Sequence, residues 1–523
     1  MNEKTDIANA ASETTNAAAD SGKEGVQNKL GDVPPEEFRA QLHKVADWIA
    51  DYREHIEQRP ISPNILPGQL TAQLPSTPPA QPENIDNIFA DFEQLIVPNL
   101  VHWGHPAFLG YFGSTTTAPG IYGEMLAAAL NVSAMTWRTS PAATELETVV
   151  LDWIRQMIEL PQEFEGVVYD TASVAIMHAL AAARENLGLN VRREGLCGRV
   201  HDAVPRLVIY ASDQAHSSIE KAAIALGIGE ANVRRVASDE NYCLKVEELR
   251  AAIAEDLRAG SRPMAVVATI GTTSATSVDP VREIAAVCRE HHLWLHVDAA
   301  YGAALALLPE GRWVMDGVAE ADSVIVNPHK WLFVPLDFSV LYTKRLDVLR
   351  ATFSLTPEYL QGDAAAGSNH EENMSRAQRN YMDYGIQLGR RFRALKAWMV
   401  FRTFGREGLQ ARIREHCRLA RLFASWVEAD ADFEVLAPVK MAVVCFRVRT
   451  KDFVRDEQLN KLNQTLVERV NATGESYLTH TRLHGKVVAR LAVGNVLTTE
   501  KHLMATWALL HSELANLRRD TRS

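Results

Sequence analysis

Four predicted β-strands are each followed by a polar side chain that could take part in catalysis. The strands and the residues that follow them are 207–210 with His216, 265–270 with Thr273, 294–297 with Asp298, and 323–326 with Lys330. Helical patterns lie between the strands, so we expect a mostly parallel sheet. Ligands of open α/β sheets bind beyond the carboxyl ends of the strands. The sequence therefore predicts that a His, a Thr, an Asp and a Lys meet at one edge of the sheet.

An amine, a carboxylate and an imidazole in one place are groups that pyridoxal phosphate requires. Lys330 would bond the cofactor's aldehyde, Asp298 would keep the ring nitrogen protonated, and His216 would lie against the ring face. Each residue alone also has a simpler interpretation, because a single His is usually a core residue and an Asp after a strand is usually a helix cap. The combination of the three is what favours the cofactor.

The cofactor's phosphate requires hydroxyls and backbone N–H groups. The segment Asp-Thr-Ala-Ser at 170–173 precedes a predicted helix over 174–187. The N-terminus of a helix favours an anion. Ala172 and Ser173 are therefore expected to bind the phosphate, together with Thr273 from the neighbouring strand end.

Composition and charge limit the classes of protein that the chain could belong to. The net charge of −11 argues against nucleic acid as a main partner. No apolar run approaches the roughly 18 residues of a membrane helix, and the N-terminus lacks the pattern of a signal peptide. Five widely spread cysteines argue against a disulfide framework and against a zinc cluster, so we predict no metal site. We expect a reduced, cytoplasmic protein.

The chain is expected to consist of a tail and three further parts. Residues 1–33 have few large apolar side chains and are predicted to be a disordered tail. The segment 34–115 begins with an amphipathic helix, in which Phe38, Leu42 and Val45 belong to one apolar stripe. Strands and helices alternate in a large domain, 116–400, and the remainder, 401–523, is predicted to be a smaller α+β domain.

One predicted helix has a clear start signal. Ser140 and Pro141 are typical of an N-cap residue and of the first helical position. We expect the apolar residues of this helix, Val149 and Trp153 among them, to form its buried face.

Seven segments carry a resemblance to a known family. They are HPAFLGYF (105–112), SPAATELETVVLDW (140–153), SDQAHSS (212–218), WLHVDAAYG (294–302), NPHKWL (327–332), IQLGRRFRALKAW (386–398) and RLAVGN (490–495). In these segments the chain resembles the group II pyridoxal-phosphate-dependent amino acid decarboxylases, which include aromatic-L-amino-acid decarboxylase. The resemblance extends from about residue 34 to 515 and implies a fold-type-I enzyme. It also implies a homodimer with the active site at the interface, where the segment 34–115 wraps the partner subunit.

The resemblance assigns further site residues. Ala300, Asn327 and His329 join the cofactor-binding set, and Tyr359, on the loop after the lysine, becomes the donor of a proton to Cα. The substrate pocket that the resemblance implies is lined by Trp103, Tyr111, Phe112, Ser114 and Met135. The implied reaction is decarboxylation of an L-amino acid to an amine and CO₂.

The substrate is the least constrained part of the prediction. Aromatic pocket residues favour Trp, Tyr, Dopa or Phe. Gly113-Ser114, Met135 and Arg138 depart from the pattern of animal aromatic decarboxylases, which leaves a non-aromatic amino acid open. Arg138 has a structural interpretation as well as a functional one.

Other activities are also open. An aldehyde could be formed by oxidative deamination, but Tyr359 and His216 favour simple decarboxylation. An aminotransferase or desulfurase on the same fold is a further alternative, although no cysteine lies in a segment typical of a desulfurase loop. A cofactor-binding DNA regulator would need a DNA-binding module, for which residues 1–33 are too short and too polar.

Overall fold

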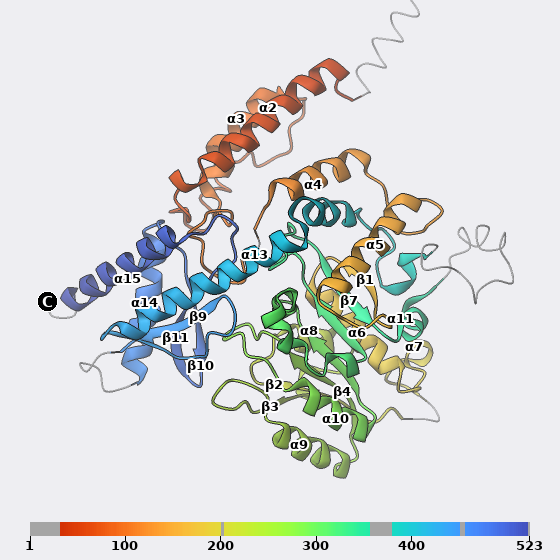
Figure 1. The fold of residues 1–523 in the computed structure, drawn as a ribbon. Coiled ribbons are helices and arrows are strands. Elements are labelled where there is room, and N and C mark those ends of the chain that lie inside the picture. Colours follow the sequence, from red (N-terminus) through yellow and green to blue (C-terminus); the bar gives the residue numbers. More distant parts are fainter. Residues whose placement is uncertain (1–31, 114, 200–202, 356–378, 450–455, 521–523) are drawn as a thin grey trace, which may run out of the picture. The chain divides into compact units, whose positions relative to one another are not determined.

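The computed structural model describes residues 32–113, 115–199, 203–355, 379–449 and 456–520 (Figure 1). The chain divides into two compact units, residues 1–59 and 60–523, and each is described by itself. In the first unit the predicted amphipathic helix is present as α2 (Pro35–Glu54), and none of its residues is buried. A 3₁₀ turn (Ile56–Gln58) follows it.

The second unit is built around a seven-stranded sheet. Its strands are β1 (Glu165–Tyr169), β2 (Leu207–Ser212), β3 (Val233–Val236), β4 (Arg262–Thr269), β5 (Trp294–Asp298), β6 (Ser323–Val326) and β7 (Ser339–Thr343). Their order is β1-β7-β6-β5-β4-β2-β3, and β7 is the one strand of this sheet that runs antiparallel to the others. The predicted mostly parallel sheet is confirmed, and the carboxyl ends of β2, β4, β5 and β6 lie at the same edge.

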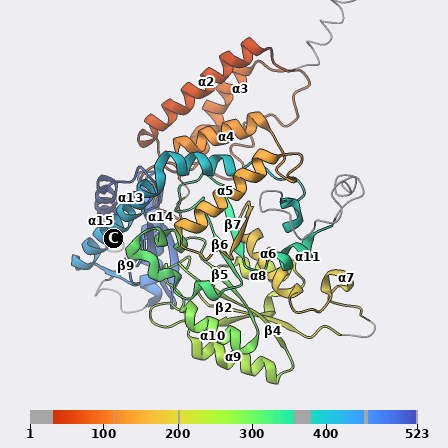
Figure 2. The ribbon, with the colours of Figure 1, turned by 45° about the vertical axis from the view of Figure 1, so that its right-hand side comes forward.

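Helices surround this sheet, and all residues of β2, β5, β6 and β7 are buried. Such strands are apolar throughout because both of their faces are covered. The helices of the second unit before the small sheet are α3 (Ile85–Asp91), α4 (Ala118–Leu130), α5 (Pro141–Met157), α6 (Ala172–Glu185), α7 (Val191–Glu194), α8 (Ser218–Ala225), α9 (Val246–Arg258), α10 (Val281–His291), α11 (Leu346–Phe353) and α13 (Ala394–Ala429). Figure 2 shows α9 and α10 close to each other beside the sheet, and both contact β4.

The start of α5 agrees with the sequence only in part. Ser140 is the N-cap residue and Pro141 the first helical residue, but the Ser140 hydroxyl donates to the carbonyl of Thr136 at 2.9 Å instead of capping the helix. Val149 was predicted to be buried and is 41% exposed. The buried face contains Glu147 instead, whose charge is paired, as described below.

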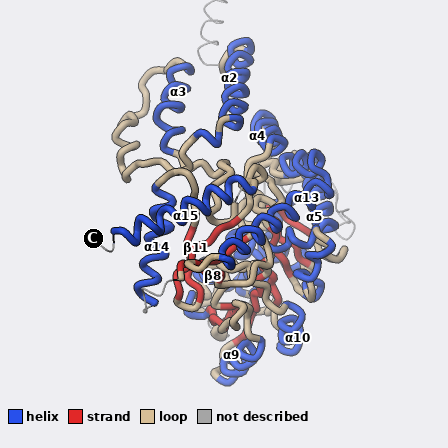
Figure 3. Tube along the Cα trace, turned by 60° about the vertical axis from the view of Figure 1, so that its left-hand side comes forward, coloured by secondary structure: helices blue, strands red, loops and turns tan. Residues whose placement is uncertain are grey.

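A four-stranded antiparallel sheet forms the core of the smaller α+β part. Its strands are β8 (Phe433–Val435), β9 (Val443–Val448), β10 (Thr479–Leu483) and β11 (Lys486–Ala492), in the order β10-β11-β9-β8. Helices α14 (Asp456–Ala472) and α15 (Glu500–Asp520) contact each other, and α13 contacts β8 and β9 (Figure 3). The long helix α13 contains one residue with non-helical angles, Gly405, at φ 62°. Two helical pieces of α13 therefore meet at this glycine.

The segment 105–113 is fastened to the small sheet. The N–H of Leu109 donates to the carbonyl of Tyr477 at 2.9 Å, and the N–H of Ala492 donates to the carbonyl of Leu109 at 2.8 Å. An aromatic segment that lies early in the chain is thereby placed beside β11. Among the described helices, none combines the length and the apolarity that a membrane crossing requires.

Candidate active site

Backbone hydrogen bonds join the ends of the central strands into one surface. The N–H of Ile270, after β4, donates to the carbonyl of Asp298 at 2.8 Å. The N–H of Asn327, after β6, donates to the carbonyl of Ala300 at 3.1 Å. Three of the predicted strand ends are therefore adjacent, which follows from the parallel register of β4, β5 and β6.

Lys330 lies at the centre of this surface. Its side chain is half-buried, and its Nζ lies 5.0 Å from the centroid of the Phe112 ring. Withdrawal from water lowers the pKa of the Lys330 amine; the Asp298 carboxylate opposes this effect and the Arg490 guanidinium adds to it. A lowered pKa increases the fraction of neutral amine, which is the nucleophilic form.

Asp298 and His216 lie within electrostatic reach of this amine. The buried Asp298 carboxylate accepts the N–H of Ala300 at its Oδ1 atom, at 3.1 Å. Burial lowers the pKa of His216; the Asp298 charge opposes this effect, and Lys330 lowers the pKa further. The structure thus brings together the three residues that sequence reasoning placed around the cofactor ring.

The protonation of His216 follows from its hydrogen bonds. Its Nδ1 accepts the backbone N–H of Ser218 at 3.1 Å and lies 2.8 Å from the Ser218 hydroxyl. A nitrogen that accepts an N–H carries no proton, so in the neutral ring the proton is on Nε2. The Ser218 contacts at the start of α8 therefore fix the orientation of this imidazole.

A stack of aromatic rings supports the lysine. The rings of Phe112 and Tyr301 are stacked at 3.9 Å between centroids, and those of Tyr301 and Trp331 at 4.8 Å with an interplanar angle of 4°. Tyr301 and Trp331 are almost completely buried. Offset stacking of this kind adds to the stability gained by burial. The residue that follows Lys330 is thereby held rigidly.

Arg490 is a buried residue of this site that sequence reasoning missed. It is 4% exposed, and its guanidinium lies 4.6 Å from the centroid of the Phe112 ring. Its N–H groups donate to the carbonyls of Ser274, at 3.2 Å, and Tyr111. Its Nη2 is buried without a hydrogen-bond partner in the part of the chain that the structure describes. An arginine in the middle of the apolar run VVARLAV was the signal that could have indicated it.

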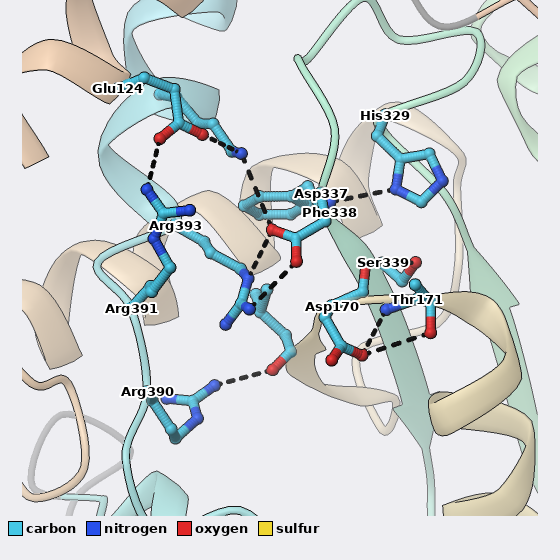
Figure 4. A network of polar contacts seen from close by, with 12 residues as sticks. Glu124, Asp170, Thr171, His329, Asp337, Phe338, Ser339, Arg390, Arg391 and Arg393 are labelled. Atoms are coloured by element: carbon cyan, nitrogen blue, oxygen red, sulfur yellow. Dashed lines mark hydrogen bonds and ion pairs between the residues drawn. The ribbon is translucent and has the colours of Figure 1, made fainter. Parts of the chain in front are cut away.

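The predicted phosphate turn lies at the start of α6, which follows β1. Asp170 Oδ1 accepts the backbone N–H of Thr171 at 2.6 Å and its hydroxyl at 3.3 Å, and the Ser339 hydroxyl donates to the carbonyl of Asp170 (Figure 4). Thr171, the N-cap residue, makes no side-chain capping bond. The N–H groups of Ala172 and Ser173 belong to the first turn of α6 and remain suited to an anion.

The other predicted cofactor-binding residues lie on the lysine loop or in the loop after β4. The side chain of Asn327 is buried, and its Oδ1 has no hydrogen-bond partner among the described residues. His329 is buried and its Nδ1 accepts the N–H of Phe338 at 3.0 Å, so the neutral ring carries its proton on Nε2. Burial lowers the pKa of His329 to about 3. Thr273 is exposed in the loop after β4.

A network of ion pairs anchors the loop that follows Lys330 (Figure 4). Asp337 accepts two hydrogen bonds from Arg393, at 2.9 and 3.2 Å, and lies 4.0 Å from the buried amine of Lys396. That amine also pairs with Glu124 of α4, which accepts a further hydrogen bond from Arg391. The three cations belong to the segment GRRFRALK, residues 389–396, which leads into α13, so this segment fastens the loop that follows Lys330 to α4.

The predicted substrate residues separate into different groups. Phe112 lies at Lys330, whereas Trp103 and Tyr111 stack on each other at 5.3 Å and are partly exposed. Both lie against Phe108, which stacks on Tyr477.

Met135 contacts a different part of the chain. Its carbonyl accepts the N–H of Met382 at 3.1 Å, and no hydrogen bond or ring contact among the described residues joins Met135 to Lys330. Ser114 and Tyr359 lie outside the described residues.

This combination of a mostly parallel sheet, an antiparallel β7 and a lysine after β6 defines a fold-type-I α/β enzyme. The chain matches the model of the pyridoxal-dependent decarboxylase conserved domain over residues 67–449. The protein therefore belongs to the pyridoxal-dependent decarboxylase family, as its sequence motifs predicted.

Relatives of known activity extend over nearly the whole chain. Tryptophan decarboxylase 2 of Oryza sativa subsp. japonica is 39% identical over 502 residues, which are 94% of this chain and 97% of the relative. Phenylacetaldehyde synthase of Arabidopsis thaliana is 38% identical over 497 residues, 93% of this chain and 98% of the relative. The crystal structure of Oryza sativa TDC with PLP and tryptamine has a TM-score of 0.86 and 36% identity, and the match covers 93% of this chain and 99% of that one.

Pyridoxal phosphate is the cofactor of this family, and the residues present fit it. The buried, unpartnered Oδ1 of Asn327 and the uncapped first turn of α6 are what a site for a polar ligand provides. Lys330, with its lowered pKa, offers an amine for the aldehyde, and Asp298 offers a carboxylate for the ring nitrogen. When bound, the cofactor supplies an electron sink that accepts the electrons of a bond broken at Cα.

Proposed function

We propose that this protein decarboxylates an aromatic L-amino acid to the corresponding amine and CO₂, with pyridoxal phosphate as cofactor. The observation that carries the proposal is the placement of Lys330. Its amine lies near an aromatic ring, Phe112, and within electrostatic reach of both Asp298 and Arg490. An amino acid substrate needs these partners, because it carries an amine, a carboxylate and, in this proposal, an aromatic side chain.

We assign the roles around the cofactor ring as follows. Lys330 would hold the cofactor at its aldehyde carbon, the same atom that the substrate amine must reach. Asp298 would keep a proton on the ring nitrogen, and its buried carboxylate is held in place by the N–H of Ala300. His216 would lie against the ring face, in the orientation that Ser218 fixes. These three residues determine how the substrate is presented to the electron sink.

We assign the phosphate to the residues near the start of α6 and the neighbouring strand ends. The N–H groups of Ala172 and Ser173 favour an anion through the helix dipole. Thr273 supplies a hydroxyl, and Asn327 and His329 complete the set from the lysine loop. The contacts of His329 with Phe338 support this assignment, because they leave the ring proton on Nε2.

Arg490 is assigned to the substrate carboxylate. A guanidinium forms two parallel hydrogen bonds with a carboxylate, and its Nη2 lacks a partner among the described residues. A bond made equally in the ground state and the transition state would not speed the loss of CO₂. We therefore propose that Arg490 selects and orients the amino acid, while Tyr359 donates the proton to Cα after CO₂ has left.

The aromatic pocket is assigned to Trp103, Tyr111 and Phe112, with Ser114 and Met135 as further lining residues. The ring stacking of Trp103 on Tyr111 supports an aromatic side chain as the preferred substrate. The partly exposed rings of Trp103 and Tyr111 would gain further burial from such a substrate.

We further propose a cytoplasmic homodimer with the active site at its interface. An exposed apolar stripe on α4 supports a second copy as partner, since Tyr122, Leu126 and Leu130 recur at intervals of four residues. The unburied apolar stripe of α2 gives the same support. Exposed stripes of this kind mark interaction surfaces.

The test is a product assay with the cofactor-loaded protein. Tryptophan, tyrosine, dopa, phenylalanine, histidine, glutamate and leucine are supplied separately, and CO₂, amine, aldehyde and hydrogen peroxide are measured together. The proposal predicts equal amounts of CO₂ and amine from at least one aromatic amino acid. No CO₂ from any of the aromatic amino acids would overturn it.

The second candidate function is the formation of an aldehyde. It is favoured by the similarity to the phenylacetaldehyde synthase of Arabidopsis thaliana. In the same assay, aldehyde and peroxide in place of the amine would support this candidate instead.

A further inference from the structure

Trp331, the residue after Lys330, is fixed by two different contacts. Its ring face stacks on Tyr301, and its indole Nε1 donates a hydrogen bond to Nδ1 of His416 at 3.0 Å. Trp331 is 1% exposed, so this hydrogen bond has no competition from water. A change in the orientation of Trp331 would move the backbone that carries Lys330.

His416 is buried in α13 and makes a second hydrogen bond. Its Nε2 lies 3.1 Å from the backbone carbonyl of Asn495. An indole N–H can only donate, so Nδ1 of His416 carries no proton, and in the neutral ring Nε2 carries the proton and donates to Asn495. Burial lowers the pKa of His416 to about 4, which keeps the ring neutral. Both hydrogen bonds therefore exist at once.

Asn495 continues these contacts into the aromatic segment. Its side-chain amide donates to the carbonyls of Gly104, at 2.8 Å, and His105, at 3.3 Å, and its Oδ1 accepts the hydroxyl of Thr115 at 3.4 Å. These three partners lie on both sides of Phe112 in the sequence. The ring of Phe112, in turn, lies at the amine of Lys330.

Two walls of the active site are thus connected through one buried imidazole. We propose that Trp331, His416 and Asn495 form a hydrogen-bonded relay in which His416 is a positioning residue for the Lys330 amine relative to the aromatic segment 105–113. The relay holds the lysine loop and the substrate wall in one fixed arrangement. Misplacement of reacting groups by about 1 Å can reduce a rate a hundredfold.

Three variants separate this role from simple packing. His416→Leu removes both hydrogen bonds, whereas His416→Gln retains an oxygen that can accept from the indole and an N–H that can donate to Asn495. Trp331→Phe keeps an aromatic ring on Tyr301 and removes only the indole donor. If His416→Leu does not fold, Trp331→Phe and its comparison with wild type still decide the question.

The matched control is Asn463→Leu. Asn463 is a buried polar side chain of α14 that likewise accepts one hydrogen bond, from Val448 N–H at 2.7 Å, and donates one, to the carbonyl of Leu459 at 2.8 Å. It belongs to the small α+β part and makes no described contact with the lysine loop. Its loss should lower the melting temperature and leave kcat within about twofold of wild type.

The relay predicts a specific pattern of kinetics. His416→Leu should lower kcat at least about tenfold, or about 1.4 kcal/mol in activation free energy. Trp331→Phe should lower it in the same way, and His416→Gln should restore it to within about threefold of wild type. The double variant Trp331→Phe, His416→Leu should be no worse than the single variants, because residues that act as a unit are not additive.

The kinetic test rests on the proposed decarboxylation. Release of the bound cofactor is a second readout that does not depend on it. The rate at which bound pyridoxal phosphate is released, measured by its visible absorbance without substrate, should rise in His416→Leu and Trp331→Phe but not in Asn463→Leu. If wild type decarboxylates nothing, the proposed function fails and this comparison still tests the relay. Three results would each overturn the inference. The first is a release rate and a kcat in His416→Leu that equal those of wild type. The others are losses that multiply in the double variant and a failure of His416→Gln to restore kcat.

Discussion

At the scale of single residues, the site is distinguished by cations held away from water. The Lys330 amine lies 5.0 Å from the centroid of the Phe112 ring, and the Arg490 guanidinium lies 4.6 Å from the same centroid. Burying a charge is costly unless a partner compensates it. Asp298 compensates Lys330, whereas among the described residues the guanidinium of Arg490 donates to two backbone carbonyls. In the proposed function the substrate carboxylate is the anionic partner of Arg490.

This difference leads to a prediction for Arg490. Arg490→Gln should raise the KM of the amino acid substrate at least about tenfold, with a smaller change in kcat, because it removes a charge-assisted contact. Arg490→Lys should lie between this variant and wild type, since a lysine keeps the charge but not the planar pair of donors. Steady-state kinetics measure both. Arg234→Gln, a change at a surface ion pair, is the control, and an unchanged KM in Arg490→Gln would remove Arg490 from the substrate site.

At the scale of secondary-structure elements, one buried ion pair fastens α5 to the segment before α13. Arg390 pairs with both oxygens of Glu147, at 2.6 and 3.0 Å, and also donates to the carbonyls of Ala134 and Val168. Glu147 is 2% exposed. Removing one partner of such a pair leaves the other charge buried and alone, which costs about 3–5 kcal/mol.

Glu147→Gln should therefore destabilise the protein strongly. We expect a loss of about 3 kcal/mol in the free energy of unfolding, seen as a lower midpoint in urea or a lower melting temperature. Glu255→Gln is the matched control, because Glu255 pairs with Arg234 at the surface and its loss should not measurably change the midpoint. Equal midpoints for the two variants would contradict this account of the pair.

The elements also show how far the sequence could predict the fold. The strands at β2, β4, β5 and β6 were found because each is a short apolar run followed by polar residues. Three strands that complete the sheet, β1, β3 and β7, were missed. β7 is buried throughout and β1 nearly so. The polar segment 170–173 directly after β1 was recognised only as the start of a helix. The burial of Glu147 in place of Val149 depends on Arg390, which is 243 residues away in the chain. No local periodicity contains that information.

Some residues of the site could be predicted from the sequence and others could not. Lys330, Asp298 and His216 follow strands, so topology alone brings them together. Tyr301 and Arg490 act through contacts between distant segments, and their positions depend on how the small sheet packs on the segment 105–113. The roles of Ser114 and Tyr359, which lie outside the described residues, stay predictions.

At the scale of the whole molecule, buried neutral histidines should determine the response to acid. Burial lowers the pKa of four of them, His178, His296, His329 and His416, to about 4, 4, 3 and 4. A histidine in the unfolded chain has a pKa of about 6.5. Between pH 6.5 and 4 the unfolded chain therefore binds protons that the folded chain does not, and the folded state loses stability as the pH falls.

Buried carboxyls with a raised pKa oppose the effect of the histidines, so the two contributions to stability must be compared. Each buried histidine contributes at most about 1.4 kcal/mol per pH unit. Burial raises the pKa of Asp279 to about 6, so below that pH this carboxyl stabilises the folded state as it takes up a proton. Burial also raises the pKa of Asp322 and of Asp383. Four histidines act against these three carboxyls, and the net expectation is destabilisation by acid.

We therefore predict a melting temperature that is nearly constant above about pH 6.5 and falls steadily toward pH 4. Thermal denaturation across this range measures it. The variant His416→Gln, which lacks one of the four titrating groups, should show a shallower fall than wild type. A melting temperature that stays constant or rises from pH 6.5 to 4.5 would contradict the assignment of these histidines as neutral.

The most direct test of the central claim follows the carboxyl carbon of the substrate. Wild-type protein and the Lys330→Ala variant, both supplied with pyridoxal phosphate, are incubated with aromatic amino acids that carry a labelled carboxyl group, and labelled CO₂ is measured. We predict release of labelled CO₂ by wild type and a fall to background in Lys330→Ala, because the Lys330 amine lies within electrostatic reach of both Asp298 and His216. Substantial release by Lys330→Ala, or none by wild type, would contradict it.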